Sequence, residues 1–261
     1  MRGRWLIALA LVATAAASAA QGVNTLEAQI RAKTRVIESP QTSRAERLDA
    51  QADRGVLFRK AGQFDLALVD LTEVLRQRAG ADDVYVERGM TYVATRQRKL
   101  AMTDFSDALR INPSNQMALS QRAALYRAQE RYDEAIRDLN QAVALDPGDP
   151  WAVSERGLDL LAKADFDAAI MDFDRALELT PTSAWTFAER GVAYLRSGRP
   201  RQAVEDLSHA LELDEGDAWT LYARGIARTK AGDVDAGRRD IAAAIKVWPD
   251  VAVAAAKDGI R

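Results

Sequence analysis

The pair Arg-Gly recurs through this sequence at a constant interval. It stands at Arg54, Arg88, Arg156, Arg190 and Arg224, and the remaining slot in the series reads Arg122-Ala123. Consecutive arginines of the series are separated by the same number of residues, as Arg54 and Arg88 are, and as Arg190 and Arg224 are. Self-similarity at a fixed period of roughly 20–50 residues is typical of folds that stack copies of one small supersecondary unit. The chain is therefore expected to consist of tandem copies of a single unit.

The residues within each copy indicate a pair of helices. With the glycine at the eighth position, six repeats span residues 48–81, 82–115, 116–149, 150–183, 184–217 and 218–251. Small residues recur at the twentieth position, at Ala67, Ala101, Ala135, Ala169 and Ala203, and large ones at the eleventh, at Phe58, Tyr92, Tyr126, Leu160 and Tyr194. Prolines that end a helix recur at Pro113, Pro147, Pro181 and Pro249. Only 7 Pro and 15 Gly interrupt a chain that is rich in helix formers, so nearly all of it is expected to be helical.

On these positions the chain resembles the tetratricopeptide repeat family over roughly residues 45–261. The resemblance implies an all-α fold, a right-handed α-solenoid of six helix-turn-helix units over residues 45–251 with a capping helix at each end. Leu26, Ile30 and Ile37 give a loose helical period that ends at Pro40, so residues 21–44 are predicted to form the N-terminal capping helix and linker. Residues 252–261 are predicted to form a C-terminal capping helix, a truncated first helix with Gly259 in register.

Residues 1–20 have the features of a signal peptide. Arg2 and Arg4 precede an apolar run from Trp5 to Ala17, which ends in small residues and predicts cleavage after Ala19 or Ala20. As a helix the run would rise only about 20 Å, too short for a bilayer core of about 30 Å. No Cys is present, so no lipid-modified Cys is expected. The protein is therefore predicted to be periplasmic or secreted, without an integral membrane span after cleavage.

Charge and residue types exclude several functions. Without Arg2 and Arg4 the chain has 34 basic and 38 acidic side chains, a net charge of −4, which argues against a nucleic-acid partner. The chain has no Cys and a single histidine, His209, on a face expected to be exposed. No phosphate-binding loop, serine elbow or metal-ligand spacing occurs. We therefore expect neither an enzyme nor a cofactor or metal site.

Two charged columns run through all six repeats. Arg occupies the seventh position, and Asp occupies the twenty-third, at Asp70, Asp104, Asp138, Asp172, Asp206 and Asp240. The arginines either line a site for an anionic polymer or pair with the aspartates between packed helices, inside one hairpin or across to the next. We favour the pairing because the two columns match one for one.

The resemblance places a ligand on the first helices, which line the concave face of such solenoids. The residues predicted to contact a partner there are Met90, Met117, Trp151, Leu158, Leu161, Trp185, Leu195, Trp219 and Tyr222, with Arg59, Arg127 and Arg196 as a positive rim. The Lys and Asn or Arg pair with which some family members bind acidic C-terminal tails is absent. The tryptophans either face an open groove or pack on the turn of the preceding repeat.

Three functions remain open on this sequence. The first is a non-catalytic adaptor of the periplasm that binds a protein or peptide segment in its apolar groove. The second is a carbohydrate-binding or polysaccharide-export scaffold, in which the spaced tryptophans stack on sugar rings. The third is self-association, in which another copy or residues 21–44 fill the groove. The sequence does not identify the partner, because groove residues rather than the repeat framework carry specificity.

Overall fold

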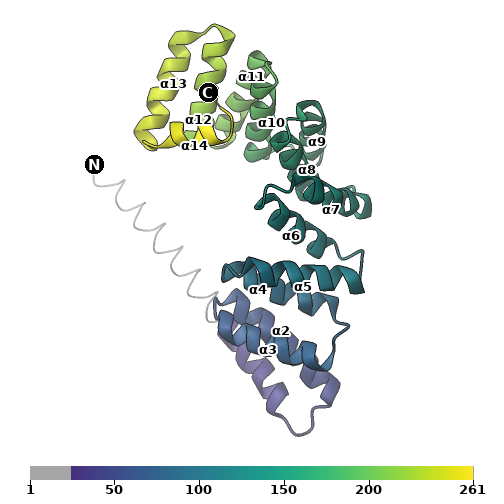
Figure 1. The fold of residues 1–261 in the computed structure, drawn as a ribbon. Coiled ribbons are helices and arrows are strands. Elements are labelled where there is room, and N and C mark those ends of the chain that lie inside the picture. The colour runs from purple at the N-terminus through teal and green to yellow at the C-terminus, as the bar shows by residue number, and fades with distance from the viewer. Residues whose placement is uncertain (1–24, 261) are drawn as a thin grey trace, which may run out of the picture. The chain divides into compact units, whose positions relative to one another are not determined.

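The protein is all-helical over residues 25–260, the part of the chain that the computed structural model describes. A helical segment at residues 25–38 is followed by α2 (Arg44–Lys60), α3 (Phe64–Gln77), α4 (Asp82–Ala94), α5 (Arg98–Ile111), α6 (Gln116–Arg127), α7 (Tyr132–Leu145), α8 (Pro150–Ala162), α9 (Phe166–Leu179), α10 (Ala184–Arg196), α11 (Pro200–Leu213), α12 (Ala218–Ala231), α13 (Val234–Val247) and α14 (Val251–Lys257) (Figure 1). The predicted all-α fold is confirmed. The predicted signal peptide, residues 1–20, lies outside the described residues.

The helices form two compact bodies, which divide in the sequence between Gln121 and Arg122. We call them the N-terminal body (25–121) and the C-terminal body (122–260). In both, consecutive helices pack as hairpins, α2 on α3, α4 on α5, α8 on α9, α10 on α11 and α12 on α13. From α4 on, the first helix of each hairpin begins at the first position of its repeat, at Asp82, Gln116, Pro150, Ala184 and Ala218. The period of the sequence is therefore the period of the fold.

The recurring glycine lets the two helices of a hairpin approach closely. A Cβ at Gly157 would lie only 2.9 Å from the Cε1 atom of Phe173, which is fully buried. At the slot that reads Ala123, the methyl group packs in a cluster with the smaller partner Leu139. Leucines face Gly55 and Gly191 in the same way, each 2.8 Å from where a Cβ would lie, so the position requires a small residue whether Phe or Leu faces it.

Every Arg of the seventh-position column pairs with the Asp of the twenty-third-position column in its own hairpin. The pairs are Arg54–Asp70, Arg88–Asp104, Arg122–Asp138, Arg156–Asp172, Arg190–Asp206 and Arg224–Asp240. Each guanidinium donates from Nε and Nη2 to both carboxylate oxygens over 2.6–3.0 Å. All six aspartates are buried. The structural interpretation is confirmed, with the pair inside one hairpin.

Several of these arginines also bind the preceding hairpin. The third nitrogen of Arg156, Nη1, donates to Asn140 of α7 at 3.0 Å, and that of Arg190 donates to Asp174 of α9 at 2.6 Å. Such an arginine joins three helices. Asp240 of the last repeat also accepts from a second arginine, Arg228, at 2.8 Å; Arg228 stands at the eleventh position, where the other repeats have a large apolar or aromatic residue.

Short segments cover the first and last hairpins. Ile30 packs on the core between α2 and α3, and Lys33 pairs with Asp53. At the other end α14 packs on α12 and α13, and Ile260 beyond it is buried in the core of the C-terminal body. Because α14 ends at Lys257, Gly259 is not the close-contact glycine that its register predicted. It has a φ of +77° just after the helix, a left-handed conformation that favours glycine.

We predict that Arg156→Ala lowers the free energy of unfolding by about 2 kcal/mol, because it leaves the buried Asp172 without its cation. Chemical denaturation measures the loss. Arg175→Ala is the matched control, because Arg175 forms an exposed ion pair with Glu178 on α9. This substitution should lower the free energy of unfolding by less than about 0.5 kcal/mol. Equal effects of the two substitutions, or loss of partner binding without loss of stability in Arg156→Ala, would contradict a structural role for the column.

Candidate partner-binding site

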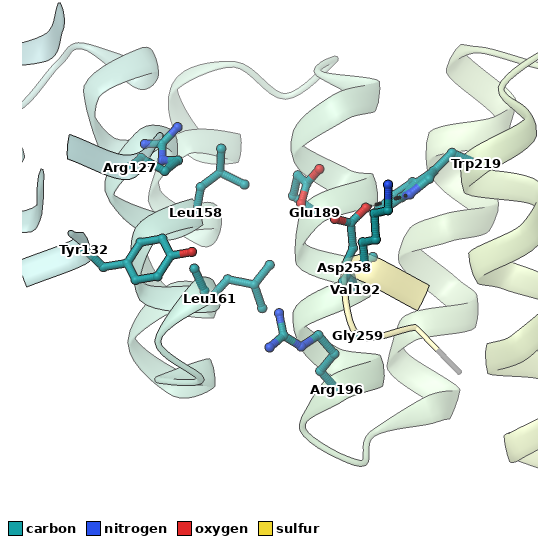
Figure 2. A pocket seen from close by; sticks show the side chains of 12 residues that line it. Arg127, Tyr132, Leu158, Leu161, Glu189, Val192, Arg196, Trp219, Asp258 and Gly259 are labelled. Carbon is teal, nitrogen blue, oxygen red and sulfur yellow. Dashed lines mark hydrogen bonds between the residues drawn. The ribbon is translucent and has the colours of Figure 1, made fainter. Parts of the chain in front are cut away.

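The first helices of the C-terminal body surround an open pocket of about 400 Å³ (Figure 2). Five of the residues predicted to bind a partner line it: Arg127 at the end of α6, Leu158 and Leu161 on α8, Arg196 on α10 and Trp219 on α12. Tyr132, Ala162, Glu189 and Val192 line the rest of it, together with Lys257 at the end of α14 and the two residues after it, Asp258 and Gly259. We call this the main pocket.

A second pocket of about 260 Å³ adjoins the first. Trp185, Asp214 and Asp217 line it, and it shares Glu189 and Trp219 with the main pocket. Asp217 also caps the N-terminus of α12 by accepting from the backbone N–H groups of Trp219 and Thr220. We call this the side pocket. The two pockets thus share two wall residues, and both present apolar and acidic groups.

The three tryptophans of the predicted ladder do not have the same surroundings. Trp151 and Trp185 are 43% and 45% exposed. Trp219 is only partly exposed, packs against the core, and donates from Nε1 to the carboxylate of Asp258 at 3.2 Å. Trp185 and Trp219 line pockets, whereas Trp151 lines neither of the two described above.

The remaining predicted contact residues lie elsewhere. Met117 is exposed on α6, Met90 is partly buried on α4, and Tyr222 packs against the core of the C-terminal body. Leu195 is 4% exposed within the same core, so the structure gives it a packing role and not the groove position that its register predicted.

Two arginines of the predicted positive rim are neutralised by carboxylates. Arg59 pairs with Glu87 at 2.8 Å, and Arg127 pairs with both Glu155 and Asp159 at 2.5 Å. The physical reason is the way that neighbouring repeats stack. The twelfth residue of one repeat lies beside the sixth residue of the next, so an arginine at the twelfth position reaches a glutamate at the sixth. These pairs correct the expectation that Arg59 and Arg127 offer free positive charge to a partner.

Arg196 differs from the other two rim arginines. No carboxylate within residues 25–260 lies at ion-pair distance from it, and its guanidinium lies over the ring of Phe166, 5.3 Å from the centroid. Of the predicted rim, Arg196 alone keeps an unneutralised charge beside the main pocket.

Glu189 is the site residue that sequence reasoning missed. It lines both pockets, and its carboxylate accepts no hydrogen bond from the described residues. Burial, together with the nearby negative charge of Asp258, raises the pKa of Glu189 to about 7. Its signal in the sequence is an acidic residue at the sixth position whose counterpart at the twelfth position of the preceding repeat, Leu161, carries no charge.

No cluster of three His, Cys, Asp or Glu side chains in the described chain is arranged to hold a metal ion. His209 lies on α11, half exposed, where it contacts Glu212 and the ring of Phe187. Between residues 25 and 260 no helix has the length and apolar character that crossing a membrane requires.

Models of the tetratricopeptide repeat match residues 82–115, 117–149 and 154–218, which together make up just over half of the chain. No curated protein sequence matches it.

Several solved structures are similar in fold. PilF of Pseudomonas aeruginosa is 20% identical, covers 77% of this chain and 92% of its own, and superposes with a TM-score of 0.66. YrrB, described as a TPR protein with an unusual peptide-binding site, is 19% identical over 72% of this chain and 97% of its own, with a TM-score of 0.60. MamA of Desulfovibrio magneticus is 21% identical over 64% and 95%, with a TM-score of 0.61. At these identities the likeness concerns the fold.

The raised pKa of Glu189 predicts a pH-dependent stability. Between about pH 4.5 and 7 the folded chain holds a proton that the unfolded chain releases, so stability falls as pH rises through this window. Glu189→Gln removes this pH-dependent loss of stability. The variant should be about 1–2 kcal/mol more stable to unfolding than the original chain at pH 8, and its advantage should be much smaller at pH 5. Chemical denaturation at both pH values measures this, with the exposed Glu205→Gln as control. An equal effect at the two pH values would contradict it.

Proposed function

The chain belongs to the tetratricopeptide repeat family, whose arrays are non-catalytic scaffolds for protein–protein interaction, and we propose that it binds a peptide segment of its partner across the main and side pockets. The observation that carries this is the pair of open pockets on either side of Glu189 and Trp219, which line both, with walls from the first helices of three consecutive repeats. Residues 150–260 of the C-terminal body supply most of the walls.

The shape of the surface favours an extended or helical segment over a folded domain. Pockets of about 400 and 260 Å³ each admit side chains, and their shared wall lets neighbouring side chains of one segment enter both. Leu158, Leu161 and Val192 supply apolar contact in the main pocket, and Trp185 supplies a half-exposed aromatic surface in the other. Tryptophan is enriched among the residues that dominate binding energy.

Carbohydrate binding remains the second candidate, because the rings of Trp151 and Trp185 are both nearly half exposed. It is supported by two tryptophans instead of three, since the indole of Trp219 is held by Asp258. Trp151→Ala separates the two functions. Sugar stacking along a ladder needs Trp151, whereas peptide binding in the two pockets does not.

Selection from a random peptide library tests the proposed function. We predict peptides that bind the chain lacking residues 1–20 and that lose at least about tenfold in affinity for the Leu158→Asp, Trp185→Ala double variant. Met171→Asp is the matched control, because Met171 is an exposed residue of α9 in the same body but lines neither pocket. Peptides that bind all three proteins equally, or no peptides at all, would refute binding at these pockets.

We also propose that the scaffold works in the periplasm or outside the cell. Arg2, Arg4 and the apolar run from Trp5 to Ala17 support this. N-terminal sequencing of the chain isolated from a bacterial host should begin at Ala20 or Gln21. A chain that retains Arg2 and Arg4 and stays in the cytoplasm would contradict export.

A further inference from the structure

An acidic residue at the sixth position of a repeat is normally met by a cation from the preceding helical element. Lys33 meets Asp53, Arg59 meets Glu87, and Arg127 meets Glu155. In the two later pairs the cation stands at the twelfth position of the preceding repeat, 28 residues before the carboxylate.

Glu189 breaks this series. At the matching twelfth position of the preceding repeat stands Leu161, which is apolar and buried in the wall of the main pocket. Glu189 therefore has the position of Glu87 and Glu155 without their arginine. The open volume of the main pocket lies beside its carboxylate, where the other two glutamates have a guanidinium (Figure 2).

The groups around Glu189 add negative charge and an aromatic ring. Asp258 acts on Glu189 from the segment after α14, and Asp214 and Asp217 line the side pocket that Glu189 shares. Trp219 lies in the wall of both pockets, and its indole N–H is bound to Asp258. Figure 2 shows Glu189, Asp258 and Trp219 on one side of the main pocket, across from Arg127 and Tyr132.

No cation among the described residues forms an ion pair with Glu189, although the charges of Arg127 and Glu155 also act on it. Arg127 is neutralised by Glu155 and Asp159. Arg196 also lines the main pocket, and its guanidinium lies over the ring of Phe166. Lys257 lines the main pocket but forms no ion pair with the described residues.

We propose that Glu189 and Trp219 form a subsite for a cationic side chain of the bound peptide, an arginine above all. The inference rests on the proposed function and specifies its ligand. A guanidinium in the main pocket would donate to Glu189 as Arg127 donates to Glu155, and the indole of Trp219 would offer an electron-rich face to the same cation. Arginine fits better than lysine because a planar guanidinium pairs with a carboxylate and stacks on a ring at once.

The repeat itself supplies the decisive variant. Leu161→Arg places an arginine at the position of Arg59 and Arg127, from which it can pair with Glu189 inside the chain. It should fill the subsite and exclude a ligand cation. Glu189→Gln removes the charge but keeps the shape, so the two variants test the same subsite in opposite ways.

The experiment compares three degenerate peptide sets, identical except for a fixed central arginine, norleucine or glutamate, with the chain lacking residues 1–20 at pH 7.5. We expect the arginine set to be retained at least about tenfold better than the norleucine set, and this preference to vanish in Glu189→Gln and Leu161→Arg. Met171→Arg controls for the added positive charge and Glu205→Gln for the lost negative one, since both residues are exposed outside the pockets. Circular dichroism melting verifies that each variant is folded.

The outcomes separate this inference from the proposed function. If the norleucine set binds as well as the arginine set and Leu158→Asp abolishes both, peptides bind at the pockets and the cation subsite is refuted. Preference for the glutamate set would also refute it and would implicate Arg196. If no set is retained by any protein, the proposed function itself fails.

Discussion

A buried bidentate bond between arginine and aspartate fixes the geometry of every repeat. Taking both charges out of water costs free energy, and only complete pairing in good geometry offsets it. The six pairs meet that condition, with both carboxylate oxygens of each buried Asp bound by its own arginine. The bond sets how the two helices of a hairpin lie, and through Asn140 or Asp174 it also sets how the next hairpin packs.

Because this framework repeats, function depends on the positions at which the repeats differ. The sixth and twelfth positions show this most clearly. Arg59–Glu87 and Arg127–Glu155 join neighbouring repeats, whereas Leu161 leaves Glu189 unpaired at the next step. One apolar replacement thus opens a pocket and leaves a carboxylate whose pKa rises to about 7. The carboxylate that pairs with an arginine of the preceding repeat at Glu87 and Glu155 is therefore available to a ligand at Glu189.

Sequence periodicity predicted what the repeat determines locally. The helical hairpins and the pairing of the Arg column with the Asp column follow from positions that recur once in every repeat. The periodicity did not reveal that Arg127 would be neutralised, since that depends on a contact between one repeat and the next. It also did not reveal that Asp258 would bind the indole of Trp219 or that Ile260 would join the core, because these residues follow the last repeat and have no counterpart in the others.

Titration of Glu189 tests the claim that its unpaired carboxylate receives a cation of the ligand. The carbon chemical shift of its carboxyl group, followed against pH, gives the pKa in the free protein and in the protein saturated with an arginine peptide. We predict a pKa of about 7 in the free protein, which falls by at least about one unit with the arginine peptide and stays unchanged with its norleucine counterpart. An ordinary carboxyl pKa in the free protein, or a raised pKa that the arginine peptide leaves unmoved, would contradict the claim.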